Sequence, residues 1–251
     1  MLTEERQAYI LDKINKYHTV KLKELVAELA TSESTIRRDF DYLEEIGLVK
    51  RVHGGAISVD GTFTFDNTIV ERSEKYTGEK IAIGRYCANL VEEGDFIYLD
   101  SGTTCYEIIP FLKGKDIVVV TNGIHNIERL LDNNIKTYIL GGFVKPLTKA
   151  VIGEELVVSL GKYRFTKAFI GANGISANSS ITTPDTSEAI IKAEVIKRSK
   201  NAYILADASK FGRVSFAKIC DLDEVSIVTS AKKEDIDKRI VDKTRLISVK
   251  I

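Results

Sequence analysis

The 251-residue chain has few cysteines, no long apolar run and no excess of either charge. Cys87, Cys105 and Cys220 lie far apart without a C-x-x-C pair, which argues against a disulfide framework or a zinc ribbon and predicts reduced packing residues. No run approaches the roughly 18 apolar residues of a membrane span, and the charged stretch after Met1 lacks the apolar core of a signal peptide. We therefore expect a globular, cytoplasmic protein without a membrane partner.

Charge over the whole chain points to no partner, because 36 Lys and Arg balance 36 Asp and Glu. Hydrophobic residues make up 44% of the chain, enough for a full core. The length allows one large domain, or a small domain joined to a medium one. Any sign of nucleic-acid binding must therefore be local.

Residues 1–58 have the pattern of a winged helix-turn-helix domain. Apolar residues recur at helical spacing in three short stretches, and Ser32 can cap the third, whose expected buried stripe contains Ile36, Phe40 and Leu43. Two short extended runs around Gly54 then predict a hairpin. In such a domain the third helix enters the major groove of DNA.

The polar residues beside this stripe suit contacts with guanine and phosphate, and the hairpin adds cations for the flanking backbone. The expected DNA-binding residues are Ser32, Ser34, Thr35, Arg37, Arg38, Lys50, Arg51 and His53. The segment is not basic, because nine Lys and Arg stand against ten Asp and Glu over residues 1–56. A structural alternative is a helical cap in which Arg37 and Arg38 pair with Asp41 and Glu44 or Glu45 across helix turns.

The stretch TSESTIRRDFDYLEEIGLVKRVHGGA, at residues 31–56, resembles the DNA-binding signature of the DeoR family of bacterial repressors. The resemblance implies operator DNA as the partner. Because paired DNA-binding domains read paired half-sites, we expect a homo-oligomer, either a dimer or a tetramer.

Residues 59–78 show no clear periodicity and are expected to form a linker. Residues 79–251 alternate apolar extended runs with amphipathic helices, which predicts a mostly parallel sheet covered on both faces. The expected strands contain FIYLD, IVVVTN, TYILGG, KAFIGANG, AYILAD and VSIVTS. The fold class is therefore α/β, with a parallel-sheet domain after the winged helix-turn-helix.

Small, polar loops follow five of these strands, and the carboxyl ends of parallel strands meet at one edge, where ligands bind. The loop at residues 100–104 leads into an expected helix whose free N–H groups would bind a phosphate. Lysines could add charge, and carboxylates and amides suit the hydroxyls of a phosphorylated polyol. The expected effector-binding residues are Asp100, Ser101, Gly102, Thr103, Thr104, Asn122, Gly141, Gly142, Gly171, Asn173, Asp185, Lys192, Asp207 and Lys210. The alternative is that Ser-Gly-Thr-Thr forms a tight turn with a helix cap and nothing more.

The second half also resembles the DeoR sensor domain, which is similar in fold to sugar-phosphate isomerases such as ribose-5-phosphate isomerase. Those isomerases carry a catalytic Asp-Gly-Ala-Asp-Glu segment where this chain has Ile-Gly-Ala-Asn-Gly at residues 170–174. General acid–base chemistry needs a carboxylate, His or Lys, and that loop contains none. We therefore expect a sensor that binds a sugar phosphate unchanged, with no enzymatic activity, cofactor or metal.

Two further arrangements could suggest catalysis. His125 follows a strand end, where a residue near a helix start is a simpler interpretation than a base. Asp207, Ser209 and Lys210 could form a Ser–Lys nucleophile pair, but no oxyanion arrangement supports it.

Within the DeoR family, several stretches resemble the fructose operon repressors of Gram-positive bacteria: MLTEERQ, SESTIRRD, YEIIPFL, VVTNG, YRFTKAFIGANGI, TTPDTSEA and ADASKFGRVSFAK. The resemblance implies fructose 1-phosphate as the inducer. A different sugar phosphate is the first alternative, and a sugar-phosphate isomerase is a remote one.

Overall fold

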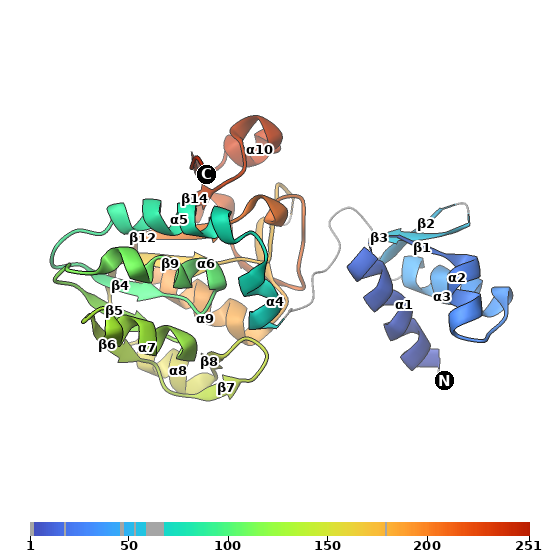
Figure 1. Cartoon of the computed structure of the whole chain (residues 1–251), viewed down its shortest axis with the longest axis horizontal. Coiled ribbons are helices and arrows are strands. Elements are labelled where there is room, and N and C mark those ends of the chain that lie inside the picture. The colour runs from blue at the N-terminus through green and yellow to red at the C-terminus, as the bar shows by residue number, and fades with distance from the viewer. Residues whose placement is uncertain (1–2, 18, 46–47, 53, 59–67, 179) are drawn as a thin grey trace. The chain divides into compact units, whose positions relative to one another are not determined.

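The computed structural model describes residues 3–17, 19–45, 48–52, 54–58, 68–178 and 180–251. The chain divides into two compact units, residues 1–64 and 65–251 (Figure 1). We call them the DNA-binding unit and the sensor unit, after the functions expected from the sequence.

The DNA-binding unit has the predicted winged helix-turn-helix layout. Its elements are α1 (Thr3–Tyr17), β1 (Thr19–Lys21), α2 (Leu22–Glu28), α3 (Glu33–Glu45), β2 (Val49–Val52) and β3 (Gly55–Ser58). Ile36, Phe40 and Leu43 of α3 are each at most 2% exposed, which confirms the predicted stripe. Strand β1 was not expected from the sequence, and it completes a three-stranded sheet of order β1-β3-β2.

An ion pair links α1 to α3 inside this unit. The Arg6 guanidinium donates to the Asp39 carboxylate from 2.6 Å, and Gln7 donates to the same carboxylate from 3.2 Å. Asp39 is buried on α3, although its type predicts an exposed position. The hydrogen bond to Asp39 raises the pKa of Arg6. The position of the third helix therefore depends on a polar contact as well as on apolar packing.

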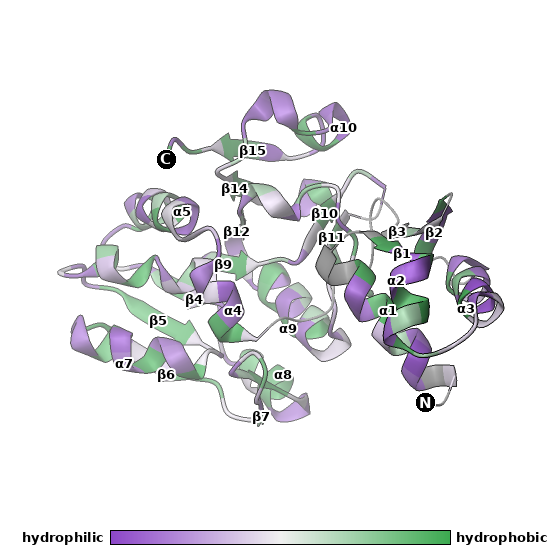
Figure 2. Ribbon diagram, turned by 45° about the vertical axis from the view of Figure 1, so that its right-hand side comes forward, coloured by the Kyte–Doolittle hydropathy of each residue, from purple (hydrophilic) through white to green (hydrophobic). Residues whose placement is uncertain are grey.

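The sensor unit is built on a seven-stranded sheet of order β15-β14-β12-β9-β4-β5-β6, and all neighbouring strands in it are parallel. Its strands are β4 (Phe96–Leu99), β5 (Val118–Thr121), β6 (Lys136–Ile139), β9 (Phe165–Gly171), β12 (Ser199–Ala206), β14 (Ser226–Thr229) and β15 (Arg245–Ser248). The sheet confirms the predicted parallel architecture. Figure 2 shows hydrophobic colouring on its central strands, which are buried on both sides.

Helices cover both faces of the sheet (Figure 1). The helices α5 (Thr77–Asn89) and α7 (Ile124–Asp132) and the 3-10 helix η1 (Ile109–Leu112) contribute to one apolar core, together with residues such as Leu99 and Phe169. The helices α8 (Glu154–Leu160) and α9 (Thr186–Lys197) contribute to the other. The three cysteines are free and buried, as expected of packing residues.

Shorter elements complete the sensor unit. They are α4 (Ile69–Glu74), α6 (Thr103–Tyr106), β7 (Phe143–Lys145), β8 (Ala150–Ile152), β10 (Gly174–Ser176), β11 (Ser180–Thr183), η2 (Ala208–Lys210), β13 (Ala217–Cys220), η3 (Leu222–Glu224), η4 (Lys233–Asp235) and α10 (Lys238–Val241). Helix α4 falls within the segment predicted to be a linker. Thr68 and Glu71 form a capping box at its start, with hydrogen bonds of 3.2 and 3.3 Å. None of the helices in the described ranges is long and apolar enough to cross a bilayer.

Candidate functional site

The outer face of α3 presents polar side chains to solvent. Ser34, Arg37 and Arg38 are exposed, and Thr35 is half-buried. Ser32 caps the helix, because its Oγ accepts a hydrogen bond of 3.2 Å from the Thr35 N–H. Arg38 makes no ion pair or hydrogen bond with the residues that the structure describes. Its five donors therefore face water, where a DNA phosphate or base edge can accept them.

The cations of this unit form other ion pairs than those expected if residues 1–58 were only a helical cap. Arg37 pairs with Glu33 at 3.3 Å, one turn earlier on α3. Arg51 of β2 pairs with Asp41, and its N–H donates to Glu44. Such exposed pairs are weak in water and can exchange for contacts with phosphate. Lys50 is also exposed, and His53 lies outside the described residues.

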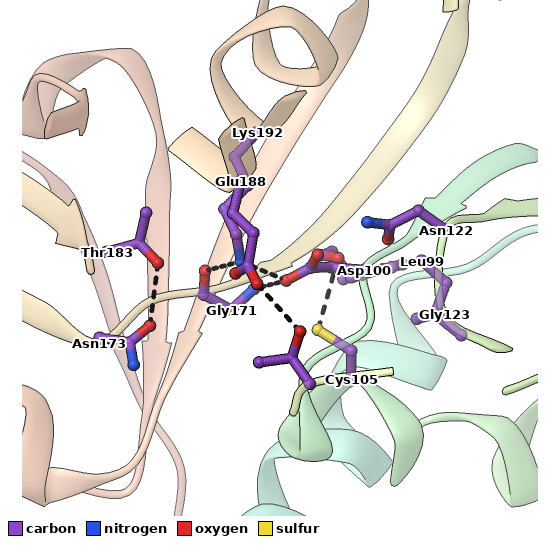
Figure 3. A network of polar contacts seen from close by, with 12 residues as sticks. Leu99, Asp100, Cys105, Asn122, Gly123, Gly171, Asn173, Thr183, Glu188 and Lys192 are labelled. Carbon is purple, nitrogen blue, oxygen red and sulfur yellow. Dashed lines mark hydrogen bonds and ion pairs between the residues drawn. The ribbon is translucent and has the colours of Figure 1, made fainter. Parts of the chain in front are cut away.

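In the sensor unit, three predicted residues meet where the sheet order reverses, between β4 and β9 (Figure 3). Lys192 Nζ of α9 lies 2.7 Å from Asp100 Oδ2 and donates to the Gly171 carbonyl from 2.9 Å. The Gly171 N–H donates to the same Asp100 oxygen from 2.9 Å. Burial opposes the charge of Lys192, but Asp100 and Glu188 outweigh it and raise its pKa. Both side chains of the pair are nearly inaccessible to water.

Unpaired acceptors lie around this ion pair. Asp100 Oδ1, Asn122 Oδ1 and Asn126 Oδ1 are buried and have no hydrogen-bond partner among the described residues. Asn122 and Asn126 are held by their amide groups, because Asn122 donates to the Val151 carbonyl from 3.1 Å and Asn126 to the Asp100 carbonyl from 3.1 Å. Buried acceptors without donors are costly. Sugar hydroxyls are donors of the kind that this set of oxygens lacks.

The loop at residues 101–104 lies next to these oxygens but differs from its prediction in one respect. The helix expected after it is the single turn α6, followed by η1. Ser101, Thr103 and Thr104 are buried, and Gly102 caps α6 without a side chain to satisfy its first N–H groups. A helix of one turn adds little dipole, because the dipole arises from aligned peptide units. The loop therefore offers hydroxyls and N–H groups rather than the positive end of a long helix.

A second cluster joins α9 to β7. Asp185 caps α9 by accepting from the Glu188 N–H at 3.0 Å, and it pairs with Lys145 at 2.8 Å. Lys145 also lies 3.3 Å from Glu188, which accepts a hydrogen bond of 3.1 Å from Thr148. Burial opposes the charge of Asp185, but Lys145 and the N–H groups of α9 lower its pKa. Asp185 thus has an evident structural partner, so its contact with an effector stays a prediction.

The predicted residues Asn173, Asp207 and Lys210 each have a local hydrogen bond or ion pair of their own. Asn173 accepts a hydrogen bond of 3.2 Å from Thr183 on β11. Asp207 is buried and caps η2, and Lys210 Nζ lies 3.8 Å from its carboxylate. The Ser209 hydroxyl donates to Asp207 rather than to Lys210, which argues against a Ser–Lys nucleophile pair.

Gly141 and Gly142 are exposed beyond the edge strand β6 and take no part in the polar network around Asp100. Gly142 has a structural reason of its own. Its φ is +149°, and a Cβ there would lie 2.5 Å from the carbonyl oxygen of Ile152 on β8. Their contact with an effector stays a prediction.

Four basic side chains close to this edge were not predicted as site residues: Arg72 of α4, Lys80 of α5, Lys145 of β7 and His125 of α7. Burial, followed by the charges of Arg72 and Lys149, lowers the pKa of His125 to about 4. The imidazole is therefore neutral at pH 7, and both of its nitrogens are buried without a partner among the described residues. The sequence feature that could have marked His125 as a site residue is its position shortly after the strand end at Asn122-Gly123.

Comparison with known proteins identifies both units. Residues 6–62 match the model of the DeoR-like helix-turn-helix domain, and residues 75–231 match the DeoR C terminal sensor domain. The chain belongs to the DeoR family. It is 46% identical to the protein named "Uncharacterized HTH-type transcriptional regulator FruR" of Bacillus subtilis, over 93% of each chain. It is 31% identical to the "Lactose phosphotransferase system repressor" of Streptococcus mutans, over 99% of this chain and 100% of that one.

Among solved structures, ribose 5 phosphate isomerase A from Neisseria gonorrhoeae is 18% identical, with a TM-score of 0.40 and coverage of 54% of this chain and 53% of that one. A likeness of this size supports no statement about activity. As a DeoR-family member the chain is a DNA-binding transcriptional regulator and not an enzyme. The expectation from the missing carboxylates at residues 170–174 is therefore confirmed by the family.

Proposed function

We propose that this DeoR-family protein represses a sugar-utilisation operon and leaves its operator when fructose 1-phosphate binds the sensor unit. The observation that supports this most directly is the cluster of buried, unpaired acceptors around the Asp100–Lys192 pair. Donors in the ligand would satisfy Asp100 Oδ1 and Asn122 Oδ1, and a sugar carries several hydroxyl donors.

The neighbouring loop at residues 101–104 suits the phosphate group of the ligand. Thr103 and Thr104 offer hydroxyls, Gly102 leaves the backbone of the loop open to close approach, and Lys210 adds a cation beyond β12. A phosphate monoester accepts many hydrogen bonds and carries about two negative charges at pH 7. The two halves of a sugar phosphate thus match two adjoining sets of groups.

The identity of the sugar rests on the relatives and on sequence resemblance. The relative at 46% identity is named FruR, and another is named for the lactose phosphotransferase system. Stretches such as YEIIPFL, which contains η1, resemble the fructose operon repressors. These observations favour fructose 1-phosphate over other sugar phosphates.

On the DNA side, the exposed arginines of α3 are proposed to enter the major groove, with Lys50 and Arg51 of the wing on the flanking backbone. A homo-oligomer would present paired α3 helices to paired half-sites. A repressor of this kind needs a ligand with different affinities for the DNA-bound and the released states.

Gel shifts with the promoter upstream of the protein's own gene, repeated with a panel of sugar phosphates, test the proposal. We expect fructose 1-phosphate to release the promoter and to raise the melting temperature by mass action, and free fructose to do much less. The sugar phosphate should be recovered unchanged when followed by NMR. The double change Thr103→Ala with Thr104→Ala should keep promoter binding and lose the response.

The possible outcomes separate the parts of the proposal. A larger thermal shift and stronger release with another sugar phosphate would keep the repressor and refute fructose 1-phosphate. Unchanged sugar-phosphate affinity in the double threonine variant would show that residues 101–104 form a turn without a role in binding. Promoter binding that no sugar phosphate weakens would refute the sensor role.

A further inference from the structure

Arg72 of α4 has buried donors that no described residue accepts. Its Nε and Nη2 atoms are buried and have no hydrogen-bond partner among the described residues. A guanidinium carries five N–H donors, and leaving charged donors unsatisfied inside a protein is costly. Such groups are the kind that a bound acceptor satisfies.

Other basic groups from three elements surround Arg72. They are Lys80 of α5, His125 of α7 and Lys210 of η2. Burial is the largest cause that lowers the pKa of each, to about 8 for Lys80 and about 4 for His125, and the charge of Arg72 lowers all three further. Segments distant in sequence therefore bring basic groups to one place, of which the His125 imidazole is neutral at pH 7.

The carboxylates nearby only partly balance this charge. Asp207 favours the charged forms of Lys80 and Lys210, and Glu107 favours that of Lys80. Glu107 also pairs with Arg129 at 3.5 Å, and Asp207 accepts the hydrogen bonds of Ser209. The partly buried cations of this cluster would be stabilised by a bound anion.

Helix α4 connects this charge to the rest of the chain. It is the first helix after the segment that joins the two units, and it contacts α6, which begins directly after Gly102. The Ile69 N–H donates to the Leu147 carbonyl from 3.1 Å, and Lys80 donates to the Arg72 carbonyl. The six-residue helix that carries Arg72 thus lies against the helix that follows the proposed phosphate loop.

We propose that Arg72 binds the phosphate group of the effector and thereby fixes α4 on the sensor unit, so that α4 transmits effector binding to the segment leading to the DNA-binding unit. This inference rests on the proposed function for the identity of the effector. The guanidinium fork can donate two parallel hydrogen bonds to one phosphate, which a lysine cannot do. A ligand shifts an equilibrium only through contacts that differ between its states, and the contact with Arg72 exists only when α4 is in place.

The test compares the full-length protein with Arg72→Gln, Arg72→Lys and the control Arg239→Gln. In the wild type the exposed guanidinium of Arg239, on α10, pairs with the N-cap residue Asp237. Calorimetry measures the affinity for fructose 1-phosphate, inorganic phosphate and fructose. We expect Arg72→Gln to weaken sugar-phosphate binding by about 10- to 100-fold, Arg72→Lys to weaken it less, and the control to bind normally. Circular dichroism and melting temperatures establish that each variant is folded.

Hydrogen exchange provides the second readout, one that a purely structural role of Arg72 would not change. In the wild type, saturating fructose 1-phosphate should slow exchange of the α4 amides, including that of Ile69, by about tenfold or more. In Arg72→Gln at matched saturation this protection should be absent, and promoter release should be lost with it.

Equal affinity in the wild type and Arg72→Gln would overturn the binding role, and full protection of α4 in the variant would overturn the coupling role. If fructose 1-phosphate fails to bind the wild type, the proposed effector is refuted, and inorganic phosphate then decides about Arg72. Phosphate binding that disappears in Arg72→Gln would support the anion site, whereas its absence from the wild type would refute it.

Discussion

In the DNA-binding unit, Arg38 stands in solvent on α3, whereas in the sensor unit Lys192 of α9 is enclosed against Asp100. Both are cations on helices, and each belongs to a predicted site. The arginine is available without any rearrangement of the protein. The positive charge of the lysine is balanced by Asp100 within the protein. The groups beside this pair that have no partner among the described residues are acceptors.

The difference follows from what each unit is proposed to bind. DNA presents a regular row of charges to a protein surface, so exposed side chains can reach it. A small sugar phosphate must be surrounded, which requires polar groups to be buried before it arrives. Substitutions should therefore affect binding alone in the first unit, and both stability and binding in the second.

The largest expected effect concerns the buried pair. Lys192→Met leaves the Asp100 carboxylate uncompensated and should lower the free energy of unfolding of the sensor unit by about 3–5 kcal/mol. Lys197→Met, an exposed position on the same helix, is the matched control and should change little. Urea denaturation followed by circular dichroism measures both. A loss below about 1 kcal/mol in Lys192→Met would contradict the enclosed ion pair.

Arg38→Ala should weaken DNA binding and leave stability unchanged. Loss of one contact should weaken operator binding by about 1–3 kcal/mol while the melting temperature stays unchanged, because Arg38 lies outside the stripe of Ile36, Phe40 and Leu43. Fluorescence anisotropy at several salt concentrations separates the two kinds of contact. A lower salt slope indicates a phosphate contact, and relaxed preference at one base pair indicates base readout. Normal operator binding by both Arg38→Ala and Arg37→Ala would refute the role of α3.

The pH dependence of effector binding should be smaller. The lowered pKa of Lys80, about 8, means that this side chain is charged at pH 7 and neutral at pH 9, while a phosphate monoester stays dianionic across that range. Affinity for fructose 1-phosphate should fall as pH rises through about 8, by about 1 kcal/mol or about fivefold. Calorimetry at pH 7 and pH 9 measures it, and Lys80→Gln should flatten the difference.

The smallest effect is expected for the exposed pair of Arg51 with Asp41, whose side chains are 37% and 56% exposed. Asp41→Asn should change stability by less than about 1 kcal/mol. It should strengthen operator binding slightly, because a negative charge leaves the DNA-facing unit and Arg51 is freed for phosphate. Thermal denaturation and anisotropy measure the two. A loss of stability above about 1 kcal/mol would show that this pair stabilises the protein more than exposed ion pairs usually do.

Sequence periodicity predicted those parts of the fold that repeat over several turns or strands. The stripe of Ile36, Phe40 and Leu43 recurs over two turns, so its burial could be predicted. The meeting of Asp100 with Gly171 could be expected as well, because parallel strands end at one edge of a sheet.

Short elements and specific partners could not be read in this way. Strand β1 has three residues and α4 has six, too few to show a period. Asp100 and Lys192 were both assigned to a ligand, and their pairing across 92 positions depends on tertiary packing. Arg72 lay in a stretch without periodicity, so neither its burial nor its lack of partners could be inferred.

The parallel pairing of β4 with β9 also sets an order of events in time. Leu99 pairs with Phe169, so the sheet cannot close at its switch point until the ribosome has made β5 to β8 and then β9 itself. The DNA-binding unit depends on contacts within its own first 58 residues and can fold while the rest is still being made. A nascent chain halted before residue 165 would therefore contain a complete winged helix-turn-helix and no closed effector site. During synthesis, the unit that reads DNA is therefore complete before the proposed effector site.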